Sequence, residues 1–300
     1  MTYDITTKTA PAMPKLGKGL DFVKLVLSQV SPDMREPIAP TLFDAAAAHI
    51  SATEFLYPDQ SWKELCGMID ALSAGSAGGK GQLQGYVEAM MRFARKHDEV
   101  ELQKLVEWQR NMKSKGANKE KPIRPDVSFW FPPSDVTNAA FIQNAMACEQ
   151  GNAHTQYYNM PEVEMADKIC GGHKQVTQTI RNIYDKARAG ALRATAEGVT
   201  GNPVLRVNMN ISCTPGEARN FFKRDLFNGT LGRVAFSYKA RGNRDGHIPR
   251  QGEYDEDFLK KLDAYIVRLQ ACKGRHVVKP LNKLADRLAL DMAALADLTD

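Results

Sequence analysis

Several features are scarce in this chain of 300 residues, and each scarcity argues against a class of protein. No apolar run approaches the roughly 18 residues that cross a bilayer. The five cysteines are widely spaced and form no CxxC pair, so neither a disulfide scaffold nor a zinc ribbon is predicted. The six histidines lack metal-ligand spacing, and no Gly-x-Ser-x-Gly or Cys–His pattern suggests covalent catalysis. The first residues also lack the pattern of a secretory signal, and we therefore expect a reducing, cytoplasmic setting without membrane contact.

Charge is nearly balanced, with 40 basic against 35 acidic residues, and the small basic excess is concentrated in two segments. Residues 110–124 hold six basic residues and one acid, and residues 239–250 hold a second basic group. Flexible basic loops suit phosphate backbones, although a solvated surface loop is the alternative interpretation. The candidate nucleic-acid contacts in the first segment are Lys113, Lys115, Lys119 and Lys121.

Apolar periodicity predicts helices at both ends of the chain and alternating strands and helices between them. We expect a helical segment over residues 1–60, a core over 61–250 and a second helical segment over 251–300. Strands are predicted at 65–72, 127–131, 155–160, 204–211 and 231–238. Ser134 or Asp135 is expected to begin the helix that follows the second strand. Strands separated by helical stretches indicate an α/β fold with a mainly parallel sheet.

A glycine-rich segment follows the first predicted strand and precedes a long predicted helix. Small residues let several backbone N–H groups point at one anion, and the start of the helix adds its positive end. A plain connection between strand and helix remains the alternative. If the segment is a phosphate-binding loop, its contacts are Gly75, Ser76, Ala77, Gly78, Gly79, Lys80, Gly81 and Gln82.

The loop departs from the GxxxxGK[ST] pattern at two positions. Ala74 stands in place of the first glycine, and Gly81 stands in place of the serine or threonine. Alanine is a mild change where no positive φ is needed. The missing hydroxyl at position 81 removes a ligand that such loops offer to Mg²⁺.

Acidic residues follow the strand predicted at 155–160. Pro161 comes first, where an aspartate would hold a metal ion, and Glu162 and Glu164 come next. Glu162 is a candidate general base, and both glutamates are candidate metal ligands. In the alternative interpretation, both acids only favour the first turn of the next helix, where negative charge is stabilised.

Two further side chains suit phosphate chemistry. Asn210, with Ser212 and Thr214, is a candidate to contact a terminal phosphate from the tip of a strand beside the loop strand. Arg233 is a candidate to stabilise charge in a phosphoryl-transfer transition state, in the same chain or in a neighbouring subunit. For Asn210 the alternative is an exposed loop end, and for Arg233 an ordinary surface arginine.

A set of ordered segments resembles a known family. The segments are Pro14–Leu16, the 73–81 loop, Ser114–Pro122, Ser134–Phe141, Glu162–Glu164, Arg206–Asn210 and Gly229–Phe236. Over about residues 14–270 they are similar to the ATPase-like core of primase–helicase-type proteins carried by bacterial mobile genetic elements. The resemblance implies a RecA-like P-loop fold of three αβα layers, ATP and Mg²⁺ as ligands, and work on DNA. It makes Lys80 the phosphate lysine, Glu162 the catalytic acid and Arg233 the arginine finger.

Two main hypotheses follow from the sequence. The first is an ATP-dependent, homo-oligomeric motor domain that processes DNA, with single-stranded DNA as the expected partner. The second is a degenerate P-loop protein that binds nucleotide or nucleic acid, or serves in assembly, without turnover. Family members commonly read Gly-Lys-Ser and Asp-Glu-Val-Glu where this chain reads Gly-Lys-Gly and Pro-Glu-Val-Glu. A nucleotide kinase is a third hypothesis. Such an enzyme needs an arginine-rich lid over its acceptor site, and only the 241–250 segment could form one.

Overall fold

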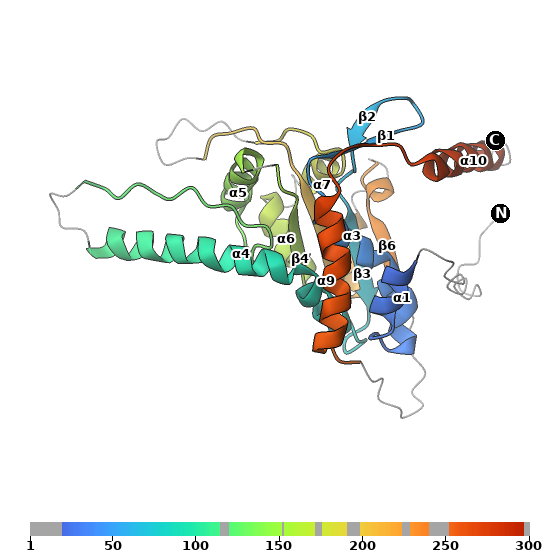
Figure 1. Ribbon diagram of the computed structural model, residues 1–300, viewed down its shortest axis with the longest axis horizontal. Helices are drawn as coiled ribbons and strands as arrows, with labels where there is room; N and C mark the ends of the chain where they lie inside the picture. The colour runs from blue at the N-terminus through green and yellow to red at the C-terminus, as the bar shows by residue number, and fades with distance from the viewer. Residues whose placement is uncertain are drawn as a thin grey trace.

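A sheet of four parallel strands lies at the centre of the molecule (Figure 1). The computed structural model describes residues 20–114, 120–151, 153–171, 176–190, 199–223, 229–239 and 252–296. In spatial order the strands are β4 (Gln156–Met160), β5 (Val207–Cys213), β3 (Ile69–Ala74) and β6 (Ala235–Lys239). The expected α/β class with a parallel sheet is confirmed.

The two central strands are buried along their whole length. Successive side chains of a strand point to opposite faces. Val207, Met209 and Ile211 of β5 accordingly join the apolar core on one face. Between them, the side-chain amide of Asn208 donates to the carbonyl of Asp44 on the other face at 2.8 Å. The polar alternation seen in the sequence of β5 is thus kept inside the protein.

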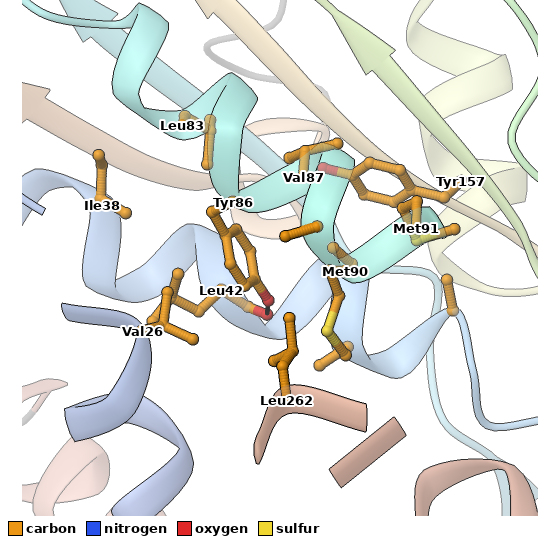
Figure 2. Packing of buried hydrophobic residues seen from close by; sticks show 14 of the residues in the cluster. Val26, Ile38, Leu42, Leu83, Tyr86, Val87, Met90, Met91, Tyr157 and Leu262 are labelled. Atoms are coloured by element: carbon orange, nitrogen blue, oxygen red, sulfur yellow. Dashed lines mark hydrogen bonds between the residues drawn. The ribbon is translucent and has the colours of Figure 1, made fainter. Parts of the chain in front are cut away.

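One face of the sheet is covered by N-terminal helices together with a late one. These are α1 (Asp21–Leu27), α2 (Arg35–Ile38), α3 (Leu42–Ala47), α4 (Gly81–Ser114) and α9 (Glu256–Ala271), with the short 3₁₀ helices η1 (Pro32–Met34) and η2 (Ala39–Thr41). Figure 2 shows Tyr86 of α4 at the centre of this core, among Leu42 and Leu262. Its hydroxyl donates to the Leu42 carbonyl at 2.6 Å, so this buried polar atom is satisfied.

The opposite face is covered by four helices from the middle of the chain. They are α5 (Asn138–Gln150), α6 (Val163–Cys170), α7 (Val176–Tyr184) and α8 (Pro215–Phe222). The cap of α5 is Thr137 and not the expected Ser134 or Asp135, because the Thr137 hydroxyl accepts from the Ala140 N–H. Helices on both faces give the domain three layers.

A second, small sheet brings together segments from both ends of the chain. Its order is β2 (Trp62–Glu64), β1 (Thr53–Leu56) and β7 (Gly274–His276). The expectation of helix through residue 60 is therefore wrong at β1. The backbone turns at Gln60, whose φ is +62°, and the Tyr57 N–H bonds the Ser61 carbonyl at 2.9 Å. The parallel partner of β1 follows α9, far along the chain, where no local pattern could indicate it.

The strand predicted at residues 127–131 does not form. The backbone N–H groups of residues 129–131 are bound by side chains and not by a neighbouring strand, although the Trp130 carbonyl accepts from the Tyr157 N–H of β4 at 2.8 Å. Asp98 accepts from Trp130 at 2.8 Å and from Phe131 at 2.7 Å, and Asn144 accepts from Phe129 at 2.7 Å. These three backbone donors are satisfied without a ladder, so β-branched and aromatic composition alone predicted the wrong element here.

Helix α4 is 34 residues long and extends beyond the body of the protein (Figure 1). Its buried residues lie between Gln82 and Glu101, and the part beyond Glu101 contributes none. Towards the C-terminus, the 3₁₀ helix η4 (Leu231–Arg233) precedes β6, and α10 (Lys279–Ala296) follows β7. Among the described residues, no helix is both long and apolar enough to cross a membrane.

Candidate functional site

The glycine loop lies at the carboxyl end of β3, between that strand and the start of α4. The loop is closed by short backbone bonds, since the Gly78 N–H donates to the Gly75 carbonyl at 2.9 Å and the Gln82 N–H to the Gly79 carbonyl at 3.0 Å. Strands β5 and β6 flank β3 on either side. The expected succession of strand, loop and helix is confirmed. Carboxyl ends of parallel strands are where such sheets bind ligands.

Two glycines of the loop are required by its shape. Gly79 has a φ of +90°, a conformation that favours glycine. A Cβ at Gly78 would lie 2.7 Å from the Gly75 carbonyl oxygen. At Gly75 and Gly81, by contrast, a Cβ would meet nothing within 4 Å. The shape of the loop therefore requires glycine at positions 78 and 79, whereas position 81 has room for a larger side chain.

The first turn of α4 is fixed by the N-terminal segment. The Gln82 side-chain oxygen accepts from the Ser31 N–H at 2.8 Å, and its amide donates to the Ser31 hydroxyl at 2.7 Å. Both residues are buried. Gln82, predicted from the sequence as a ligand contact, uses its side chain in this internal pair.

Lys80 is half-buried beside the tip of β5 and the start of α8. There the Thr214 hydroxyl accepts from the Glu217 N–H at 3.4 Å, and Glu217 accepts from the Thr214 N–H at 2.6 Å. This capping bond, with the nearby charge of Lys80, lowers the pKa of Glu217. Thr214, a candidate phosphate contact in the sequence, thus acts as a helix cap.

A cleft of about 720 Å³ opens beside the loop, along α4. Its lining joins the loop, the end of β4 and β5, and the segment after residue 128, and includes Lys80, Gly81, Gln84, Phe131, Pro161 and Ser212. Cavities of this size hold small molecules of the mass of a nucleotide. Residues from distant parts of the sequence meet here because β5 lies between the loop strand β3 and the acid-bearing strand β4.

The predicted acids stand at the carboxyl end of β4 but do not converge on a metal position. Glu162 is the N-cap residue of α6 without a side-chain capping bond, and Glu164 is in the first turn; both are exposed. Among the described residues, no three His, Cys, Asp or Glu side chains form a group suited to a metal ion. With a glycine at 81 and a proline at 161, the residues present do not fit the expected Mg²⁺ site.

Asn210 lies in the middle of β5 and is fully buried, so the structure corrects its expected position at the strand tip. It is paired in register with Asp70 of β3 and Asn159 of β4. Its oxygen accepts from the Ser212 hydroxyl at 3.4 Å, and its amide nitrogen has no partner among the described residues. Ser212 is two residues closer to the carboxyl end of β5, and it lines the cleft.

Arg233 lies at the amino end of β6, opposite to the loop. It pairs with Asp185 at 3.4 Å and donates to the Gly229 carbonyl at 2.9 Å, with its guanidinium 5.5 Å from the ring centre of Tyr184. Because β6 runs parallel to β3, these contacts are at the other end of the sheet from Lys80. The prediction that Arg233 acts at the loop of its own chain is therefore wrong.

Two of the four candidate nucleic-acid lysines, Lys113 and Lys121, lie at the far end of the α4 projection. Lys113 is in the last turn of α4 and Lys121 begins the returning segment; both are exposed. Lys115 and Lys119 lie outside the described residues, as does the second basic segment at 241–250. Nearby, Trp108 donates to the Pro122 carbonyl at 3.0 Å, which holds the returning segment against the helix.

Sequence reasoning missed a buried pair of carboxyl groups, Asp44 of α3 and Asp70 of β3. Burial, together with the neighbouring Asp70 charge, raises the pKa of Asp44 well above its usual value, and burial raises that of Asp70 to about 7. The Tyr157 hydroxyl donates to Asp44 at 3.4 Å. The available signal was an aspartate inside each of two apolar runs, 42–48 and 67–72.

Comparison with family models, with curated proteins and with solved structures finds no match for this chain. The resemblance to primase–helicase-type ATPases thus remains a prediction from the residues.

Proposed function

We propose that the protein binds a nucleoside triphosphate, with its phosphates at the glycine loop. The observation that carries the proposal is the position of a loop with conformationally required glycines and a lysine at the carboxyl end of the central parallel strand. The loop opens directly into the cleft lined by Lys80 and Gly81. Backbone N–H groups there and the positive end of α4 favour an anion.

The order of the strands supports the same function. β5 separates the loop strand from β4, so the tip of β5 stands between the loop and the acids. In a RecA-like P-loop ATPase working on DNA, as the family resemblance implies, this arrangement would bring Lys80, Ser212 and Glu162 around one phosphate. Single-stranded DNA, a homo-oligomer and a cytoplasmic setting belong to this proposal. In such an oligomer Arg233 acts on the neighbouring subunit, since it lies away from its own loop.

The test of nucleotide binding is the variant Lys80→Ala, measured by calorimetry with ATP. We expect ATP binding to be lost, because Lys80 is part of the loop and lines the cleft. Lys96→Ala is the matched control, since Lys96 is an exposed lysine on the same helix, outside the cleft lining. An unchanged affinity in Lys80→Ala would remove the phosphate-loop assignment.

A second candidate function is nucleotide binding without turnover. The paired absence of a hydroxyl at Gly81 and a carboxylate at Pro161 favours it, because both are the groups that would hold Mg²⁺. The structure has room for a side chain at position 81, so the missing hydroxyl can be restored without a clash.

The double variant Gly81→Ser with Pro161→Asp distinguishes the two candidates. If the protein is a motor weakened only in metal binding, we expect the rate of ATP hydrolysis to rise by at least tenfold, and to rise further with single-stranded DNA. In the same assay the native protein gives the starting rate, and Lys80→Ala gives the rate without nucleotide binding. No gain in rate would favour the binding protein.

A further inference from the structure

We propose that the end of the cleft away from the glycine loop binds the base of the nucleotide, stacked on the guanidinium of Arg95. This inference rests on the nucleotide binding proposed above and adds where the base lies. Lys80 and Gln84 line the cleft beside the loop, and Phe131 lines it beside Arg95. A cavity with a cationic end and an aromatic end suits a ligand with a phosphate chain and a planar ring.

Arg95 is held in one orientation by its own helix. Its Nε donates to one oxygen of Glu88 at 2.8 Å and its Nη2 to the other at 2.7 Å. The guanidinium carbon lies 4.8 Å from the centre of the Phe131 ring, at a distance typical of a cation–π contact. A two-point bond to a carboxylate and a ring on one side fix the plane of the group.

The guanidinium is still accessible, because 47% of the Arg95 side chain is exposed. Nucleobases stack on arginine planes and on aromatic rings in many nucleotide-binding proteins. Phe131 itself is buried, so the arginine covers the ring and presents the plane that a base can reach.

The position along α4 matches the length of a nucleotide. Arg95 reaches back towards Glu88, and Gly81 and Glu88 are seven residues apart, which corresponds to about 10 Å along a helix. A ribose and a phosphate chain span a distance of this order. Between the two ends, Gln84 donates to Glu88 at 2.7 Å and accepts from Asn159, so polar groups line the middle of the cleft.

The acids of the cleft do not oppose a bound anion near the loop. The charge of Glu88 is offset by Arg95, and Asp98 accepts from the backbone N–H groups of Trp130 and Phe131. Glu99 lies beyond Arg95, at the end of the cleft away from the phosphates.

The experiment compares ATP with inorganic triphosphate in calorimetric titrations of the native protein and of Arg95→Lys. Lysine keeps the positive charge beside Glu88, but it loses the two-point bond and has no plane on which a base can stack. We expect Arg95→Lys to weaken ATP binding by about 5- to 150-fold, the range measured for losing one stacked base. Binding of inorganic triphosphate should change by less than twofold. Lys96→Arg, at the neighbouring exposed position, is the matched control and should leave both ligands unaffected.

Three results would overturn the inference. If the native protein bound ATP and inorganic triphosphate with equal affinity, the base would contribute nothing to binding. Equal losses for both ligands in Arg95→Lys would make Arg95 a phosphate contact. A loss of binding to a single-stranded oligonucleotide with unchanged ATP binding would assign the plane to a nucleic-acid strand.

Two further measurements keep the result interpretable. Thermal unfolding of each variant checks that the fold is retained, and Phe131→Leu, which keeps the buried apolar volume, should weaken ATP binding in the same selective way as Arg95→Lys. Failure of the underlying function looks different, because then neither ATP nor triphosphate binds the native protein and Lys80→Ala changes nothing.

Discussion

The two ends of the parallel sheet are built in opposite ways. At the carboxyl end, β3 passes into an open glycine loop next to a cleft, and Lys80 is half-buried beside it. Towards the amino end, Asp70 of the same strand is buried against Asp44, and Arg233 is paired with Asp185. Another cavity, of about 1,040 Å³, lies at this end and is lined mostly by apolar residues.

The comparison separates polar groups that are placed to contact a ligand from polar groups that contact each other inside the fold. At the carboxyl end they face a cleft and leave backbone donors at a helix start. At the amino end charged and polar groups contact each other, so they change the stability of the folded state: the Arg233–Asp185 ion pair favours it, and the buried Asp44–Asp70 pair opposes it when ionised. We therefore expect substitutions at the two ends to separate stability from nucleotide binding.

The largest expected effect on stability is in the pH dependence caused by Asp70. Its pKa is raised from 3.8 to about 7 by burial, so the folded protein keeps a proton that the unfolded chain releases above about pH 4. Stability should fall as the pH rises from about 4 to about 7, by on the order of 2–4 kcal/mol from Asp70, and Asp44, whose pKa is also raised by burial, adds to the fall. Urea unfolding across this range measures the slope.

The variant Asp70→Asn removes that titrating group, and its unfolding free energy should depend less on pH between 4 and 7. Asp135→Asn, at an exposed carboxylate near the other end of the sheet, is the control and should keep the native slope. ATP affinity should be the same in both variants. A native slope in Asp70→Asn would show that Asp70 does not hold the extra proton.

The next effect in size is at the glycine loop. Gly78→Ala places a methyl group 2.7 Å from the Gly75 carbonyl, so the loop must open. We expect at least a tenfold loss of ATP affinity in calorimetry with a stability cost of about 1–2 kcal/mol. Gly75→Ala meets nothing within 4 Å and is the matched control. If the two variants bind ATP equally well, the closed shape of the loop is not what holds the phosphates.

The smallest expected effect is that of Arg233→Ala. Its ion pair with Asp185 is partly exposed, at 30% and 47% of the two side chains, and such pairs contribute about 0–1 kcal/mol. Thermal unfolding should show a small shift, and ATP affinity of the isolated chain should be unchanged. A large drop in that affinity would contradict the separation of the two ends.

Local patterns predicted the elements around the glycine loop better than they predicted the outer parts of the fold. The loop, the strand before it and the helix after it were predicted correctly because glycines, apolar runs and helical spacing are short-range signals. The strand at 127–131 was predicted wrongly because Asp98 and Asn144 take the hydrogen bonds that a neighbouring strand would make. Strand β1 has a near partner in β2, but its parallel partner β7 is more than 200 residues away in the sequence, so local patterns could not indicate this sheet.

Local sequence patterns were enough to predict an α/β chain with a glycine loop between a buried strand and a long helix, since strand and helix periods and the conformational freedom of glycine are local properties. Which side chains share an end of the sheet depends on how the strands pack. Strand order places Ser212 at the cleft, buries Asn210 and Asp70, and moves Arg233 to the opposite end. These relations depend on which strands pair in parallel, and pairing is fixed by the packing of the whole core.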